Sequence, residues 1–120
     1  AVLLPLDPDA SAERIRAALG AERAVIISDT FGRPWREGLV DVAIGVAGLA
    51  PLRDYIGQTD RAGRELQVTV MARADQIAAA AGLLMEKDKG QPAVWVEGVA
   101  IEGRGTLRDL LRDPARDLFR

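Results

Sequence analysis

The segment from Val40 to Leu49 alternates large and small side chains, and this alternation restricts the fold more than any other feature of the sequence. Branched apolar residues occupy every second position, and small or polar residues stand between them. A period of two is the pattern of a β-strand, whose successive side chains point to opposite faces. Glycine and alanine on one face leave room for a second backbone. We therefore expect a strand that packs closely against a neighbouring element.

The segment 72–87 predicts the clearest helix of the chain. Its apolar residues recur at intervals of three and four, and four consecutive alanines supply the best helix former. A second helix is expected from Asp9 or Ser11 to about Leu19, with Gly20 as its terminator. A short third helix is expected at 106–111, limited by Pro114. The residues expected on the buried side of the second helix are Ile15, Ala18 and Leu19.

Several short apolar runs predict further strands, at 2–4, 24–28, 66–70 and 93–96. Loops are expected at 29–38 and 55–63, where glycine, proline and charged residues gather. Strands and helices mix without a strict β-α-β order. We therefore predict one α+β domain over residues 1–120, with a mixed or antiparallel sheet, one long alanine-rich helix and two shorter helices.

The composition excludes several classes of function. The net charge is −2 and no basic face with interleaved aromatics is visible, which argues against nucleic acid as a partner. No apolar run approaches the roughly 20 residues that a membrane-spanning helix needs. The chain has no cysteine and no histidine, so thiol nucleophiles, Ser-His-Asp triads and the usual zinc sites are excluded within it. Any metal would be a hard ion bound by oxygen.

The segment Ser28-Asp29-Thr30 is the first candidate for chemistry. A carboxylate beside a hydroxyl at the end of a strand offers hard oxygen ligands for Mg²⁺ or Mn²⁺. Magnesium usually keeps several waters and substrate phosphates, so one or two protein oxygens suffice. The alternative is that Asp29 and Thr30 only cap a turn, because both residue types are common in turns.

Two charged segments could bind anions. Arg33 and Arg36 lie three residues apart beside Pro34 and Trp35, and two guanidinium groups could reach one phosphate or carboxylate. The turn after the long helix, 86–90, contains a lysine that could contact phosphate. The alternative for both segments is a solvated surface with ion pairs of little energetic value.

Four stretches together resemble the family of coenzyme F420-0:L-glutamate ligases, in one unbroken order over nearly all 120 residues. They are LLPLDPDASAERIR, IISDTFGRPWREGLVDVAIGVAGLAPLRDYIGQTDRAGRELQVT, ARADQIAAAAGLLMEK and PAVWVEGV. The resemblance implies a GTP-dependent amide ligase that activates the terminal carboxylate of F420-0 as an acyl phosphate. The amine of L-glutamate then displaces phosphate and extends a γ-linked tail.

The resemblance also implies site residues and partners. Asp29 and Thr30 match the metal ligands in the family's Ser/Thr-Asp-Thr segment, and Arg33 and Arg36 match its pattern, with a role as phosphate or tail-carboxylate binders. The family implies GTP as co-substrate, Mg²⁺ or Mn²⁺, K⁺ as a further cation, an intertwined homodimer and a cytoplasmic location. The residues that match the GTP-contacting part are Leu83, Leu84, Met85, Glu86, Lys87 and Asp88. Glu86 stands where a glycine is commoner.

Family members carry about as much sequence again before this region, including a further aspartate metal ligand and an asparagine. The chain opens on Ala1 directly before an apolar run, so we expect it to be the C-terminal half of a larger catalytic module that needs the N-terminal half for a full site. Two alternatives stay open: a non-catalytic dimerisation or scaffold fragment, and a nucleotide-binding domain with a different acceptor.

Overall fold

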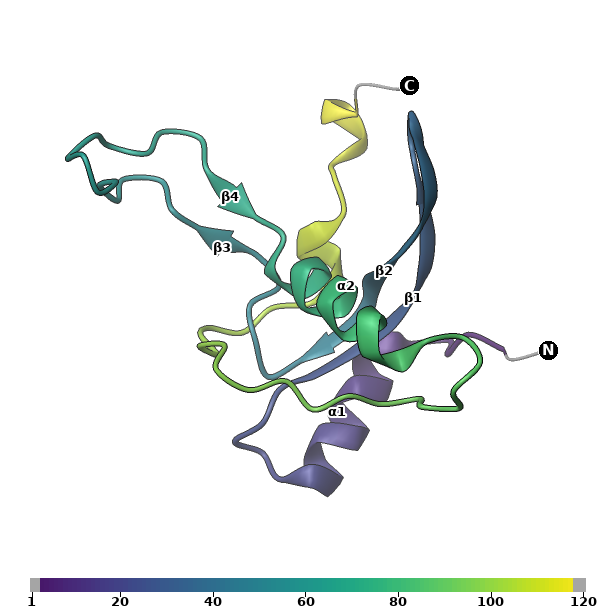
Figure 1. Ribbon diagram of the computed structural model, residues 1–120. Helices are drawn as coiled ribbons and strands as arrows, with labels where there is room; N and C mark the ends of the chain where they lie inside the picture. The colour runs from purple at the N-terminus through teal and green to yellow at the C-terminus, as the bar shows by residue number, and fades with distance from the viewer. Residues whose placement is uncertain (1–2, 118–120) are drawn as a thin grey trace.

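A computed structural model describes residues 3–117 and has the predicted α+β fold, with two antiparallel sheets of two strands each (Figure 1). The first sheet is a long hairpin of β1 (Val25–Arg33) and β2 (Arg36–Ala47). The pairing runs from Val25 opposite Ala47 to Arg33 opposite Arg36, with register shifts after Ile27 and after Gly32. The predicted strand at 40–49 is confirmed as most of β2.

Two α-helices pack mainly against β2. Helix α1 (Pro8–Leu19) begins after Asp7, whose carboxylate accepts the Ala10 N–H at 2.9 Å, and it ends at Gly20, whose φ of 109° suits glycine. Helix α2 (Arg73–Met85) confirms the predicted alanine-rich helix. The N-cap is Asp7 rather than the expected Asp9 or Ser11, because its carboxylate reaches the Ala10 amide, whereas Gly20 ends α1 as expected.

The core lies where the two helices meet the sheet. Its buried members are small or aliphatic, and half-buried apolar side chains from β1, α2 and the C-terminal segment surround them. At Gly45 an added Cβ would lie 2.6 Å from the main-chain carbon and oxygen of Pro8. This contact confirms that the small-residue face of β2 admits another backbone. The buried members of the core cluster are Ala43, Val46, Leu49 and Ala74.

Carboxylates from the two helices bind main-chain amides of β2. Asp75 of α2 accepts the Ala43 N–H at 3.0 Å, and Asp9 of α1 accepts the Val46 N–H at 2.7 Å. Asp9 also accepts the Leu107 N–H, at 3.0 Å to its second oxygen. Hydrogen bonds to ionised acceptors are stronger than neutral ones. These two acids therefore fix both helices to the strand and join the C-terminal segment to them.

The second sheet forms an arm that extends away from the helices (Figure 1). Strands β3 (Arg53–Asp54) and β4 (Val70–Met71) pair over two residues each, and Thr59 bridges to Glu65 farther out. The loop predicted at 55–63 is confirmed, whereas the strand predicted at 66–70 is reduced to its last residue and the one after it. After α2 come two 3₁₀ helices: η1 (Leu107–Leu110) lies where the short third helix was expected, and η2 (Pro114–Arg116) was not predicted.

Three further predicted elements differ from the structure. Residues 3–4 are not a strand, and residue 2 lies outside the described residues. Residues 93–96 are also irregular, because no neighbouring strand pairs with them in the described part of the chain. The loop predicted at 29–38 is mostly strand: β1 continues to Arg33, since β2 supplies hydrogen-bonding partners that outweigh the local turn signal of Gly32 and Pro34.

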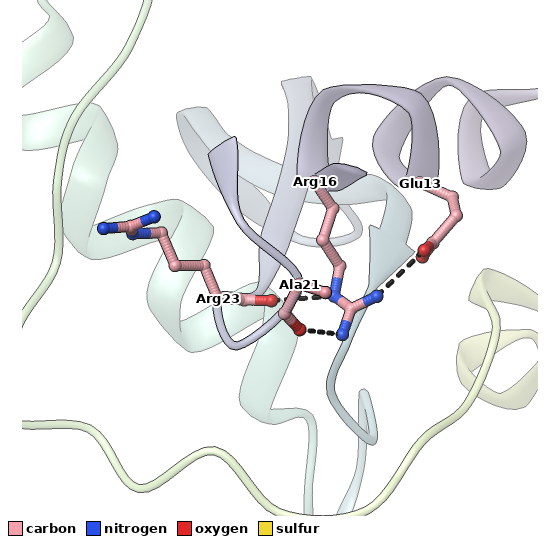
Figure 2. Close-up of polar contacts among 4 residues, drawn as sticks. All are labelled: Glu13, Arg16, Ala21 and Arg23. Carbon is pink, nitrogen blue, oxygen red and sulfur yellow. Dashed lines mark hydrogen bonds and ion pairs between the residues drawn. The ribbon is translucent and has the colours of Figure 1, made fainter. Parts of the chain in front are cut away.

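The buried face of α1 was also predicted wrongly. Ile15, Ala18 and Leu19 are exposed, and the buried positions are Ala12 and Arg16. Figure 2 shows the reason: the Arg16 guanidinium donates to the carbonyls of Ala21 and Arg23 and pairs with Glu13. A buried arginine that closes the turn after its own helix is not visible in the apolar periodicity. Among residues 3–117, no helix has the length and apolar character needed to cross a membrane.

Candidate functional site

The predicted metal ligands lie in the middle of β1 rather than after a strand. Asp29 is exposed and its carboxylate accepts the Thr30 N–H at 2.7 Å. Asp29 pairs with Val42 and Thr30 with Asp41 in the hairpin. Successive side chains of a strand point to opposite faces. One ion that contacts both residues would therefore use a side-chain oxygen of one and a main-chain oxygen of the other.

The two arginines flank the hairpin turn. Arg33 and Arg36 are cross-strand partners, and the Arg33 Nη2 atom donates to the carbonyl of Glu37 at 2.8 Å. The Nε atom of Arg33 is buried without a hydrogen-bond partner among the described residues. Because a strand rises about 3.3 Å per residue, four residues separate Arg33 from Asp29 by about 13 Å. The structure thus brings the arginines together but keeps them apart from Asp29.

The segment predicted to contact GTP forms the end of α2 and the turn after it. Leu83 and Leu84 are exposed, Met85 is half-buried and closes the helix, and Glu86 follows with a φ of 38°. That backbone conformation favours glycine. The family resemblance implies that glycine is commoner than glutamate at this position, and the conformation is consistent with that expectation. Lys87 and Asp88 continue into an exposed turn.

Asp41 is a buried acid at the cavity that the sequence pattern did not single out. It lies in β2 opposite Thr30, is only 8% exposed, and its Oδ1 atom is 3.2 Å from the Nζ atom of Lys87. A Cβ atom added to Gly82 would collide with the Asp41 carboxylate. One signal was present: a charged residue interrupts the small-residue face of the alternating strand, and acids are rarely buried without a partner.

A cavity of about 810 Å³ lies between the end of α1, the start of β1, α2 and the segment 91–101. Most of its lining is apolar, as in small-molecule sites that add a few polar groups for orientation. Asp29 and the end of α2 both line it, whereas Thr30, Arg33 and Arg36 do not. The charged residues of its lining are Glu22, Arg23, Asp29, Asp41, Glu86 and Lys87.

The described residues do not by themselves form a metal site. Within residues 3–117, no group of three or more acidic, histidine or cysteine side chains could hold a metal ion. Asp29 nevertheless fits a single ligand, because its carboxylate is exposed and Mg²⁺ is often held by one or two carboxylates with water and phosphate. Further ligands would come from a nucleotide or from residues outside this chain.

Comparison with known proteins identifies the family of the chain. The family model described as F420-0:Gamma-glutamyl ligase matches residues 1–98. The coenzyme F420:L-glutamate ligase of Methanothermobacter thermautotrophicus is 50% identical over 98% of this chain and 50% of its own length. Those of Archaeoglobus fulgidus and Methanopyrus kandleri are 46% and 45% identical, each over 99% of this chain. The chain spans about half the length of these relatives. It belongs to the F420-0:gamma-glutamyl ligase family.

Proposed function

We propose that this chain is the C-terminal half of a GTP-dependent ligase that adds L-glutamate to the deazaflavin coenzyme F420-0. One observation carries the proposal: relatives named coenzyme F420:L-glutamate ligases align with 98–99% of the chain at 45–50% identity. The proposed protein is cytoplasmic, forms a homodimer, and needs an N-terminal half for the complete site.

The proposed reaction has two steps. A carboxylate oxygen of F420-0 attacks the γ-phosphorus of GTP, the bond from that phosphorus to the bridging oxygen breaks, and GDP leaves. The amine of L-glutamate then attacks the acyl carbon, phosphate leaves, and the amine loses a proton as the amide forms. Repetition would extend a γ-linked tail.

The chain's own residues have two roles in this proposal. Asp29, with Thr30, binds Mg²⁺ or Mn²⁺, an ion that would supply positive charge near the transferred phosphoryl group. The segment from Leu83 to Asp88 contacts GTP, with K⁺ as a further cation of the site. The support is geometric: Asp29, Met85, Glu86 and Lys87 line one cavity.

Arg33 and Arg36 are proposed to bind the glutamate-tail carboxylate or a phosphate. Like charges directly opposite each other on neighbouring strands are unfavourable, and an anion between the two guanidinium groups would relieve that repulsion. Arg36→Ala should then weaken substrate binding by more than about tenfold, which exceeds an exposed ion pair. Arg61→Ala, at the exposed end of the arm, is the matched control. An unchanged affinity in Arg36→Ala would refute this role.

A titration tests the nucleotide site. We expect saturable, calorimetrically detected GTP binding by the folded chain in Mn²⁺, abolished by Asp29→Ala. Glu37→Ala removes the same charge from the same hairpin outside the cavity lining, and should leave binding intact. Equal loss in both variants would show that overall charge, not Asp29, matters.

A ligation assay tests the reaction itself. The chain is combined with a complementing N-terminal half, F420-0, L-glutamate and GTP, and the mass of the coenzyme is followed. The expected product is heavier by one glutamyl residue, together with GDP and phosphate. A folded complex that binds all three substrates but forms no product would favour the second candidate, a non-catalytic dimerisation or scaffold fragment. The incomplete set of metal ligands within residues 3–117 is the observation that supports this second candidate.

A further inference from the structure

The ion pair between Asp41 and Lys87 joins a buried acid to an exposed base. The Asp41 side chain is 10% exposed and the Lys87 side chain 75%. The pair spans 46 positions of sequence and links the middle of β2 to the turn after α2. Exposed ion pairs order their side chains only weakly because water screens them. Here the acid is buried, which reduces that screening, and the Lys87 Nζ atom lies 3.2 Å from the Asp41 Oδ1 atom.

The position of Asp41 is difficult to explain by stability alone. Gly82, in the last turn of α2, leaves the space that the Asp41 carboxylate occupies. The C-terminal end of a helix carries partial negative charge, and a carboxylate nearby is disfavoured. Burial adds a desolvation penalty. Both effects oppose a carboxylate at this position. Asp41 is therefore better explained by its contact with Lys87 than by a gain in folding free energy.

Asp41 also lies between the two segments of the proposed site. It pairs across the hairpin with Thr30, which follows Asp29. Asp41, Lys87 and Asp29 all line the same cavity. A lysine ammonium has three N–H donors, and the bond to Asp41 uses one of them. The others can reach an anion that enters the cavity.

We infer that Asp41 is a positioning residue that holds the Lys87 ammonium at the cavity for a phosphate group of the nucleotide. The inference rests on the proposed function, because it assumes that the turn after α2 meets a nucleoside triphosphate. Lys87 supplies the contact, and Asp41 acts through it. The Asp41–Lys87 pair thereby connects β2, which pairs with the strand of the proposed metal ligand, to the nucleotide turn.

A double-mutant cycle tests whether Asp41 acts through Lys87. GTP affinity is measured by calorimetry in Mn²⁺ for the unaltered chain, Asp41→Asn, Lys87→Gln and the double variant. Loss of a charged hydrogen bond should weaken binding about tenfold in each single variant. If Asp41 acts only through Lys87, the double variant should bind like Lys87→Gln alone. Lys89→Gln removes a neighbouring lysine that pairs with Glu86 instead, and should bind like the unaltered chain.

The outcomes separate this inference from the proposed function. An unaltered, folded chain that binds no GTP, alone or with a complementing N-terminal half, overturns both. Binding in which the Asp41→Asn and Lys87→Gln losses add in the double variant overturns only the inference, because Asp41 would then act independently of Lys87. If Asp41→Asn does not fold, the Lys87→Gln variant provides the test, since Lys87 is on the surface. A GTP affinity of Lys87→Gln equal to that of Lys89→Gln overturns the inference.

Discussion

The two ends of the β1–β2 hairpin have the same backbone pairing but different surroundings. Its base, residues 25–28 with 43–47, is packed under both helices, and Ala43, Val46 and Ala47 are buried. Its tip, residues 31–33 with 36–40, extends beyond the helices (Figure 1). Phe31 and Leu39 are 59% and 69% exposed there.

The difference in packing between base and tip separates the residues that stabilise the fold from those of the candidate site. A two-stranded hairpin alone is marginal in water, so the base must supply the packing that holds the fold. The candidate site, Asp29 to Thr30 with Asp41, lies between base and tip, next to the last turn of α2. Substitutions at the base should therefore unfold the chain, whereas those at the tip should leave it folded and test function directly.

Gly45→Ala should produce the largest effect. The new Cβ would overlap the Pro8 main chain, which cannot move without displacing α1. We expect a loss of about 3 kcal/mol in the free energy of unfolding, measured by urea denaturation. Gly32→Ala is the matched control at the tip, because the nearest atom to its Cβ would be Leu39 Cδ2 at 3.9 Å. Equal losses in the two variants would contradict the distinction between base and tip.

Asp9→Ala should have the next largest effect. It leaves the N–H groups of Val46 and Leu107 without their acceptor in a part-buried place. We expect about 2 kcal/mol of destabilisation, since an N–H group that is buried without an acceptor costs free energy. Asp75→Ala removes the acceptor of one amide, Ala43 N–H, and should lose about half as much. A larger loss for Asp75→Ala would show that α2, not α1, is the main support of the base.

The arm is a second exposed region, and hydrogen bonds to the Asp60 carboxylate hold its end together. Asp60 accepts the N–H groups of Ala62 and Arg64 and pairs with the Arg64 side chain. The Arg64 amide, more than the other contacts, lowers the pKa of Asp60 from its ordinary value of 3.8. A carboxyl group whose pKa is lower in the folded than in the unfolded state stabilises the fold at pH values above its unfolded pKa. This stabilisation is lost as the pH falls through the folded-state pKa.

We therefore expect hydrogen exchange at the Ala62 and Arg64 amides to rise, relative to a buried helix amide such as that of Ala78 in α2, as the pH falls below about 4. Asp60→Asn should remove most of this pH dependence without altering the urea midpoint. A shift of that midpoint comparable to Asp9→Ala would mean that the arm supports the fold globally.

Trp35→Gly, in the hairpin turn, should have the smallest effect. Trp35 has a φ of 57°, a conformation that glycine adopts without strain. The relief of strain and the added backbone entropy of glycine oppose each other, so the unfolding free energy should change by less than about 1 kcal/mol. Thermal denaturation by circular dichroism would measure it. A loss of several kcal/mol would show that the tip contributes to the fold after all.

Much of the local structure was predictable because it follows local signals. Gly20 ends α1 as predicted and the alanine run marks α2, although α1 begins after Asp7 rather than after Asp9 or Ser11. The alternation at 40–49 predicted both the strand and its close backbone contact at Gly45. The predicted site residues stay predictions, although the structure brings Asp29 and Lys87 to one cavity.

The errors have a common cause in non-local pairing. The 29–33 stretch has the composition of a loop, yet it is a strand because β2 pairs with it. Ile15 fits an apolar helix face, yet Arg16 is buried because carbonyls from the following turn accept its guanidinium. Local periodicity contains no information about such partners.

By itself, the sequence determined the family, the α+β class, both α-helices and the half-length relation to known ligases, because these depend on residue order and local propensity. Only the tertiary structure decided that Asp41 is buried beside Gly82 and paired with Lys87. It also decided that Arg33 and Arg36 lie away from Asp29. The reason is physical: burial and ion pairing depend on how β2 and α2 meet, and residues 46 positions apart have no local pattern in common.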